Sequence, residues 1–332
     1  MPGRAATALA CALALAACSR GAAPSAGSPP SPAVAGLGAP PGGAAAAIDW
    51  DHPAALLALD ADEAARRLGS FEWSGTASFT VTTQADRTAR VHAEERHRVR
   101  QSVDGEFEAN AEIDEGRGPG GETGKHVLFA GGLTYARAQY APWRERPTDH
   151  GRDARRFRDE SFTMAGDLAR LHGPALSLTP AGEIQLLGRT ARRFTVALAR
   201  EPQAGAAAGA DPRTFPAGGP DEETRRHLAF LDGRVPVAAS GELLFDAATG
   251  VPLRARLTGA FSVKDDPRVR VQVEVTGEVK ALGSKVAAVA APKNALKDSR
   301  KPQGVALALE RAGFKSRDKA AAAEPADEPD AP

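Results

Sequence analysis

Two histidines, His92 and His97, come nearest in this chain to a metal-binding pattern, in the segment His-Ala-Glu-Glu-Arg-His. The order of its histidines and carboxylates matches neither helical zinc motif, H-E-x-x-H or H-x-x-E-H. In a strand the two histidines point to opposite faces, and on a helix they lie about 140° apart. They are therefore predicted not to share a metal, and the pattern is typical of a solvated strand.

A glycine-rich stretch, residues 116–121, has the composition of a phosphate-binding loop. No strand–helix–strand unit is predicted around it, and no helix follows it whose N-terminus could bind phosphate. Gly124 and Lys125 are followed by histidine, so the P-loop spacing fails as well. The stretch is predicted to be a loop between strands.

The remaining residue types add no catalytic pattern. The seven histidines are scattered without ligand spacing, and no G-x-S-x-G sequence occurs. Asp265 and Asp266 precede a proline and are typical of a turn. We therefore expect a protein that is not an enzyme and that carries neither a metal nor a cofactor.

The N-terminus has the features of an export signal. Arg4 precedes an apolar run, residues 5–17, which is too short to span a bilayer and is typical of a signal peptide. The run ends in Leu15-Ala16-Ala17-Cys18, which resembles the lipobox of bacterial lipoproteins. That resemblance implies cleavage before Cys18, a diacylglyceryl group on its thiol, and up to three acyl chains on this residue, palmitate included. The alternative is an ordinary secretory signal in which Cys18 is incidental.

Acylation at Cys18 would determine where the protein works. Two or more acyl chains give stable membrane attachment. Ser19 follows the cysteine, and an Asp there would favour the inner membrane of a Gram-negative cell. We therefore expect a lipid anchor in the cell envelope, at the outer membrane and facing the periplasm.

Composition divides the mature chain into three parts. Residues 18–47 comprise Cys18 and a stretch that is almost entirely Ala, Gly, Pro and Ser, with Arg20 its only charge. Such a stretch cannot bury enough apolar surface to fold and is predicted to be a flexible tether. Residues 48–314 are predicted to form a single domain. Residues 315–332 are predicted to be a disordered tail.

The hydrophobic pattern of the domain alternates with a period of two over most of its length. Phe71, Trp73, Ala77, Phe79 and Val81 alternate with polar residues, and three such runs between residues 235 and 279 form a meander. Helical periodicity appears at residues 153–172, in a short helix at 221–231, and in one or two short helices at 51–68. The fold class predicted is α+β: a large curled antiparallel sheet of about ten strands, a half-open barrel, with a few covering helices.

This order of elements, with the hairpin sequence Asp246-x-x-Thr249-Gly250-x-Pro252, resembles the outer-membrane lipoprotein carrier superfamily (LolA/LolB-like) over residues 50–292. The resemblance implies a half-open barrel whose concave face, capped by helices, holds acyl chains. The chain is longer than the typical carrier. It also has no match for the exposed loop leucine with which the membrane-anchored carrier transfers cargo.

The inward-facing residues of the last strands are mostly Val, Ala and Gly, which leaves volume that either helices or a ligand must fill. Both alternatives remain open. If a ligand fills it, the residues expected to line the cavity are Phe79, Val91, Phe107, Leu243, Phe245, Leu257, Phe261 and Val273.

A dense run of arginines lies in the middle of the chain. It is interpreted either as a solvated loop and helix start or as a surface that contacts anionic lipid head groups. Its members are Arg144, Arg146, Arg152, Arg155, Arg156 and Arg158.

Charge limits the range of partners. The chain has 42 Lys and Arg against 42 Asp and Glu, and nucleic-acid binding needs a clustered basic surface, so no nucleic-acid partner is expected. The function predicted is a membrane-anchored lipoprotein that binds a lipid or lipidated ligand without catalysis. The alternative is a structural or assembly lipoprotein of the envelope that binds a protein partner.

Overall fold

The computed structural model describes residues 48–83, 86–116, 123–147, 149–199, 222–264 and 266–297. The expected signal peptide, Cys18 and the tether lie outside the described residues, as does the predicted tail. The predicted domain, residues 48–314, is described up to residue 297.

Within the described ranges, eleven antiparallel strands form one open sheet. The strands are β1 (Phe71–Thr83), β2 (Asp86–Gln101), β3 (Phe107–Asp114), β4 (Thr123–Ala130), β5 (Leu133–Ala138), β6 (Arg144–Arg146), β7 (Leu176–Leu186), β8 (Arg189–Leu198), β9 (Arg234–Asp246), β10 (Pro252–Val263) and β11 (Asp266–Leu282). Their order is β6-β5-β4-β3-β2-β1-β11-β10-β9-β8-β7, so the first and last strands pair at the centre. The predicted curled antiparallel sheet is confirmed, with β6 as a strand that the sequence did not predict.

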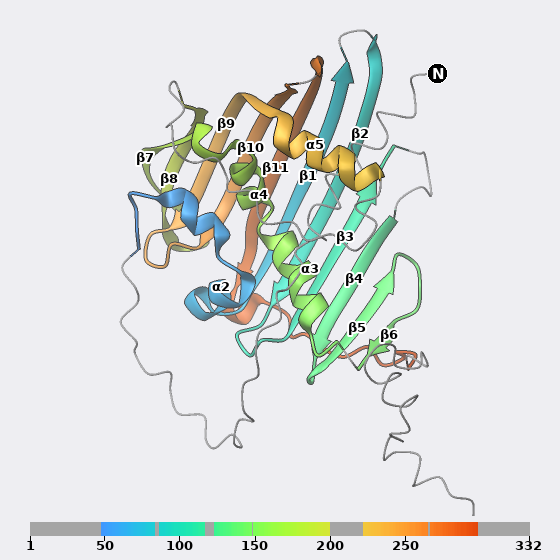
Figure 1. Cartoon of the computed structure of the whole chain (residues 1–332). Helices are drawn as coiled ribbons and strands as arrows, with labels where there is room; N and C mark the ends of the chain where they lie inside the picture. Colours follow the sequence, from blue (N-terminus) through green and yellow to red (C-terminus); the bar gives the residue numbers. More distant parts are fainter. Residues whose placement is uncertain are drawn as a thin grey trace, which may run out of the picture.

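The helices lie on one face of this sheet, as Figure 1 shows for α2, α3, α4 and α5. The helical segments are η2 (Pro53–Ala58), α2 (Ala61–Leu68), α3 (Arg152–Phe162), α4 (Met164–His172), η3 (Gly173–Ala175), α5 (Glu222–Gly233) and η4 (Gly283–Lys285). The chain leaves the sheet at β6, one edge, and re-enters it at β7, the other edge. The segment that makes this crossing, α3 and α4, therefore covers the middle of the concave face.

The predicted helix at residues 153–172 is wrong in one respect, because it is two helices that meet at Thr163. Thr163 has φ −92° and ψ 10°, and its Oγ1 donates to the Asp159 carbonyl at 2.9 Å. A threonine that bonds back to the preceding turn offers the backbone an alternative to the helical ladder. The break gives α3 and α4 separate contacts with the sheet.

The other helical predictions are confirmed. Residues 53–68 form two short segments, the first a 3-10 helix and the second α2. Asp60 caps α2, because its Oδ1 accepts from the Glu63 amide at 2.7 Å. The short helix predicted at residues 221–231 is α5.

The hairpin between β9 and β10 is held by Asp246, which is 1% exposed. Its carboxylate accepts from the Thr249 hydroxyl at 2.7 Å and from the Ala248 amide at 3.2 Å. Arg189 of β8 donates to both of its oxygens. Although burial by itself raises the pKa of the Asp246 carboxyl, the bonds from Arg189 and Thr249 hold that pKa below its ordinary value.

The opposite face of the sheet is covered at one end by the segment that follows β11 (Figure 1). Val289 packs on Leu128 and Tyr135, and Leu296 forms a parallel bridge with Arg144 of the edge strand β6. None of the described helices is long and apolar enough to cross a membrane.

Candidate functional site

The C-terminal half of the concave face, under η2 and α4, is apolar. Phe194, Phe245 and Trp50 contact one another with ring centroids 5.7–6.4 Å apart. His172 of α4 is 3% exposed and lies on the Phe261 ring at 4.6 Å. Both of its ring nitrogens face carbonyl oxygens, Leu168 at 3.0 Å and Ala238 at 3.2 Å.

At the centre of the sheet the inward residues are small, and aromatic rings cover them. Gly75 of β1 and Gly277 of β11 are cross-strand partners, and the Trp73 indole lies over both. A Cβ at Gly75 would come within 2.4 Å of that indole, and one at Gly277 within 2.8 Å. Phe162, the last residue of α3, packs on Trp73 at 5.8 Å. Trp73 and Phe162 therefore fill the space that the glycines leave.

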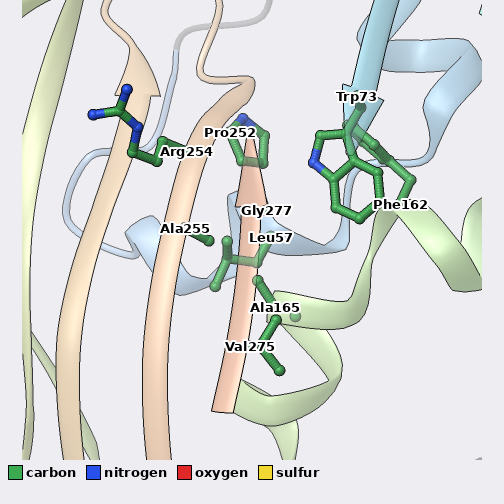
Figure 2. Close-up of a pocket in the computed structure, with 10 residues that line it drawn as sticks. Leu57, Trp73, Phe162, Ala165, Pro252, Arg254, Ala255, Val275 and Gly277 are labelled. Carbon is green, nitrogen blue, oxygen red and sulfur yellow. The ribbon is translucent and has the colours of Figure 1, made fainter. Parts of the chain in front are cut away.

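A small apolar cavity remains beside these rings, between η2, α4 and strands β10 and β11. Its volume is about 20 Å³. Figure 2 shows Leu57, Ala165 and Val275 converging on it and Trp73 with Phe162 at one end, while the Arg254 guanidinium points away. One water needs about 10–15 Å³ and drug-sized ligands occupy roughly 300–1,000 Å³, so the helices fill the concave face here.

Seven of the eight residues predicted to line a ligand cavity lie in the core instead of around open space. Phe79, Phe107, Leu243, Phe245, Leu257, Phe261 and Val273 are buried in one hydrophobic cluster, each at most 9% exposed. None of these seven described residues lines the 20 Å³ cavity, whose walls include Leu57, Trp73 and Phe162. Leu257 borders a second hollow beside His172, with no measurable volume. Val91 lies on β2 opposite Val81, and its side chain is outside the described part of the chain.

The N-terminal half of the concave face differs, because it buries polar groups under α3. Glu95 and His97, two residues apart on β2, both point inward and are each 9% exposed. His97 Nδ1 lies 3.0 Å from Ser161 Oγ of α3, and His97 Nε2 lies 3.2 Å from Glu95 Oε2. His92, five residues earlier, is exposed, so the prediction that the two histidines face opposite sides is confirmed, but the prediction of a solvated position is wrong for His97.

The hydrogen bonds of this cluster can be arranged in two ways. The Ser161 hydroxyl also lies 2.9 Å from the Phe157 carbonyl, and its single proton serves either that oxygen or His97 Nδ1. If Ser161 donates to His97, then His97 Nε2 donates to a Glu95 carboxylate. If Ser161 donates to Phe157, both ring nitrogens of His97 face acceptors, and the cluster needs one more proton between His97 and Glu95.

The second carboxylate oxygen of Glu95, Oε1, is buried and has no hydrogen-bond partner among the described residues. Leaving a buried acceptor unpaired costs about 1–3 kcal/mol, and more if it is charged. The Ser–His–Glu order resembles an acyl-transfer relay, but Ser161 is 1% exposed and lies within a helix. As folded, α3 keeps the Ser161 hydroxyl away from solvent.

Beside this cluster, Arg158 of α3 is 1% exposed, which corrects its prediction as a membrane-contacting residue. Its guanidinium donates to both oxygens of Asp62 at 2.8 and 3.0 Å and to Gln101 Oε1 at 2.9 Å. It also donates to Asp159 and lies over the Phe107 ring at 4.6 Å. Burial raises the pKa of the Asp159 carboxyl despite the adjacent Arg158. Arg158 joins α2 and α3 to the sheet.

The other arginines of the run lie near the surface. Arg144, Arg146 and Arg152 are exposed, whereas Arg155 lies over the Phe129 ring and Arg156 pairs with Glu160. Burial raises the pKa of the Glu160 carboxyl. No group of three metal-ligating side chains lies together within the described ranges.

Comparison with known proteins gives matches among solved structures. No protein-family model and no curated protein sequence matches the chain. Among solved structures, the chain is similar to a DUF1329 family protein from Desulfovibrio piger, with 9% identity, 70% of this chain and 93% of the other covered, and a TM-score of 0.23.

The chain is also similar to two further solved structures. One is a putative outer membrane lipoprotein-sorting protein domain from Vibrio parahaemolyticus, with 10% identity, coverage of 68% and 92%, and a TM-score of 0.22. The other is a LolA superfamily protein from Nitrosomonas europaea, with 8% identity, coverage of 70% and 95%, and a TM-score of 0.21.

Proposed function

We propose that this protein is a lipid-anchored envelope protein that binds an acyl chain of a lipid or lipidated ligand on the concave face of its sheet, without catalysis. The observation that carries the proposal is the apolar cavity at the joint of η2, α4 and the sheet. It lies beside the inward-facing glycines of β1 and β11, where the Trp73 and Phe162 rings fill the space that the glycines leave. An acyl chain would take that space when α3 and α4 move outward.

Such a movement is compatible with the way the helices are built. α3 has 11 residues and α4 has 9, and isolated helices shorter than about 12–15 residues are marginal in water. Their stability therefore comes from packing on the sheet, and the break at Thr163 lets them move separately. Each buried CH₂ of an acyl chain contributes about 0.8 kcal/mol, which offsets the cost of separating the helices from the sheet.

In this proposal Cys18 carries the lipid anchor, and Ile48, the first described residue, lies against the turn at Gly250 between β9 and β10. The exposed arginines Arg144, Arg146 and Arg152 lie toward the opposite edge of the sheet, at β6 and the start of α3. They are suited to contact anionic head groups. The expected destination is the periplasmic side of the outer membrane.

Binding can be measured on the full chain carrying Cys18→Ser, with dansyl-undecanoate as a fluorescent acyl probe. We expect saturable binding, which Ala165→Met weakens at least tenfold, because the longer side chain fills the cavity that Ala165 lines. The matched control is Arg170→Met, which places the same side chain on the exposed side of α4.

Native mass spectrometry of the same chain, after incubation with phosphatidylethanolamine vesicles, gives an independent result. Lipid retained by the unmodified and Arg170→Met chains, but not by Ala165→Met, is expected. A chain that binds neither probe nor lipid, or that binds both equally in all three forms, contradicts the proposal.

A protein partner is the second candidate, favoured by the start of β9, which the described part of β8 does not pair with. Val235 and Val237 at the start of β9 are 45% and 44% exposed. This part of β9 pairs with β10, and within the described residues its pairing with β8 begins only at Ser240. An open, apolar edge can accept a strand from another chain. A photo-crosslinker at Val237 that captures one dominant protein in cells, with no lipid bound by the purified chain, would favour this role.

A further inference from the structure

The buried polar cluster under α3 lies close to the apolar cavity, on the same face of the sheet. Glu95 of β2 pairs with Ala77 of β1, and Ala77 pairs with Val275 of β11, which lines the cavity. Two interstrand spacings separate Glu95 from Val275, about 10 Å. Ala77 lies between these two, and Gly75 lies between His97 and Gly277. Because Ala77 and Gly75 are small, the Trp73 and Phe162 rings separate the polar cluster from the cavity.

On its other side the cluster approaches solvent. Glu95 pairs with Ile113 of β3, which is half-buried, and Ile113 pairs with Thr123 of β4, which is exposed. Lys125, exposed on β4, lies over the Phe157 ring of α3 at 4.7 Å. A molecule that enters between α3 and β4 would therefore meet Glu95 and His97 before it meets the apolar cavity.

The groups of the buried polar cluster determine which head groups the site can bind. Glu95 Oε1 is a buried acceptor without a donor among the described residues, and a carboxylate can only accept. A donor on the ligand would satisfy it, whereas a second carboxylate or a phosphate would place two negative charges together in a site of low dielectric. An ester group that lacks a donor would leave Oε1 unpaired.

We propose that Glu95, His97 and Ser161 form the head-group site for a single-chain amphiphile whose polar end donates a hydrogen bond, through a hydroxyl or an amide N–H, and carries no negative charge. The acyl chain extends over Gly75 and Gly277 toward the cavity at Leu57 and Ala165. This inference rests on the proposed function, since α3 must move for the ligand to enter. It adds a direction to the proposed binding: the polar head group lies under α3 and the acyl chain lies toward the cavity.

Three twelve-carbon probes test it on the Cys18→Ser chain by isothermal titration: 1-monolauroylglycerol, methyl laurate and laurate. The first has hydroxyl donors, the second has none, and the third is an anion. We expect 1-monolauroylglycerol to bind tenfold to a hundredfold more tightly than methyl laurate, as a hydrogen bond to a charged acceptor implies. Laurate should bind most weakly at neutral pH.

The matched variant is Glu95→Met, which keeps the length of the side chain and removes the acceptor. It should reduce the preference for 1-monolauroylglycerol over methyl laurate to about onefold while methyl laurate still binds. Ser161→Ala, which removes one hydroxyl from α3, should partly reduce the preference for 1-monolauroylglycerol over methyl laurate. It is the test variant if Glu95→Met does not fold.

The outcomes separate this inference from the function on which it rests. If the unmodified chain binds all three probes equally, or prefers laurate, the head-group site is wrong and the acyl-chain proposal stands. If it binds none of them, both fail. If the preference is present but survives in Glu95→Met and in Ser161→Ala, another group recognises the donor and the inference is overturned.

Discussion

Each half of the concave face buries one histidine, but the surroundings of the two histidines differ: one lies among apolar groups and the other among polar groups. Under α4, His172 lies among apolar side chains, on Phe261 and against backbone carbonyls. Under α3, His97 lies between a carboxylate and a hydroxyl, and Ser161, its partner, is one helical turn from the buried ion pair of Arg158 with Asp62. One sheet therefore has an apolar half and a polar half under two consecutive helices.

This difference has a consequence for function. An apolar half can be filled by side chains alone, as interiors generally are. A polar half costs free energy wherever a group is left unpaired, and Glu95 Oε1 is such a group among the described residues. The contrast matches the two ends of an amphiphile, and the following variants test whether the halves behave as differently as their composition indicates.

The largest effect is expected at Arg158 in the polar half. Arg158→Ala leaves Asp62 and Asp159 without this partner and should lower the free energy of unfolding by about 3–5 kcal/mol. The loss should be smaller at pH 3 than at pH 7, because burial raises the pKa of the Asp159 carboxyl, which is then protonated at pH 3 and no longer needs the guanidinium. Urea denaturation at both pH values measures it. Arg152→Ala, at an exposed position, is the control and should change stability by less than about 0.5 kcal/mol.

In the apolar half, Leu243→Ala should cost about 2–5 kcal/mol, since Leu243 is fully buried and its removal leaves a cavity. The loss should be the same at pH 3 and at pH 7, because no ionisable group is involved. A pH-dependent loss at Leu243, or a pH-independent one at Arg158, would show that the halves do not differ in the way described.

Replacing Asp246 should lower the free energy of unfolding by a smaller amount, and only over a defined range of pH. Its folded pKa is lowered, so its contribution is present above the ordinary aspartate pKa of about 3.9 and is lost as the pH falls through the folded value. Asp246→Asn should cost about 1–3 kcal/mol at pH 7 and little at pH 2. Thermal unfolding of the unmodified chain and of Asp246→Asn between pH 2 and pH 7 gives the stability of each as a function of pH. The two stabilities should become equal only near pH 2.

The smallest effect on stability concerns the surface arginines. The triple change Arg144→Ala, Arg146→Ala and Arg152→Ala should alter unfolding by no more than about 0.5 kcal/mol per site, because all three side chains are exposed. It should nevertheless weaken binding to vesicles containing phosphatidylglycerol, by about 1 kcal/mol per charge at low salt. Co-sedimentation at low and at high salt measures this, and equal binding by both chains would exclude the arginines as a membrane contact.

The sheet could be predicted from the sequence because its signal is local. Strand β3 alternates buried and less buried residues with a period of two, and β10 does the same. The sequence did not predict β6, because the three residues from Arg144 to Arg146 show no alternation of apolar and polar side chains. The break at Thr163 was missed because the apolar spacing continues through it at Met164 and Leu168.

The polar half could not be predicted in the same way, because its contacts join distant parts of the chain. Arg158 meets Asp62 across 96 residues and Gln101 across 57, and nothing local separates it from the exposed arginines beside it. Glu95 and His97 did carry a signal. They share the parity of Val99 on β2, and that parity places them on the inner face with the apolar residues. The many charged residues between His92 and His97 predict a solvated strand, and this prediction overlooks that parity.

The central claim is that an acyl chain reaches the space that Trp73 now fills. The chain contains three tryptophans, so Trp50→Phe and Trp143→Phe in the Cys18→Ser background leave Trp73 as the sole indole. A monoacylglycerol with a brominated acyl chain quenches an indole only on contact. The account predicts saturable quenching of Trp73 that Ala165→Met reduces, whereas binding without any quenching of Trp73 would place the ligand elsewhere and contradict it.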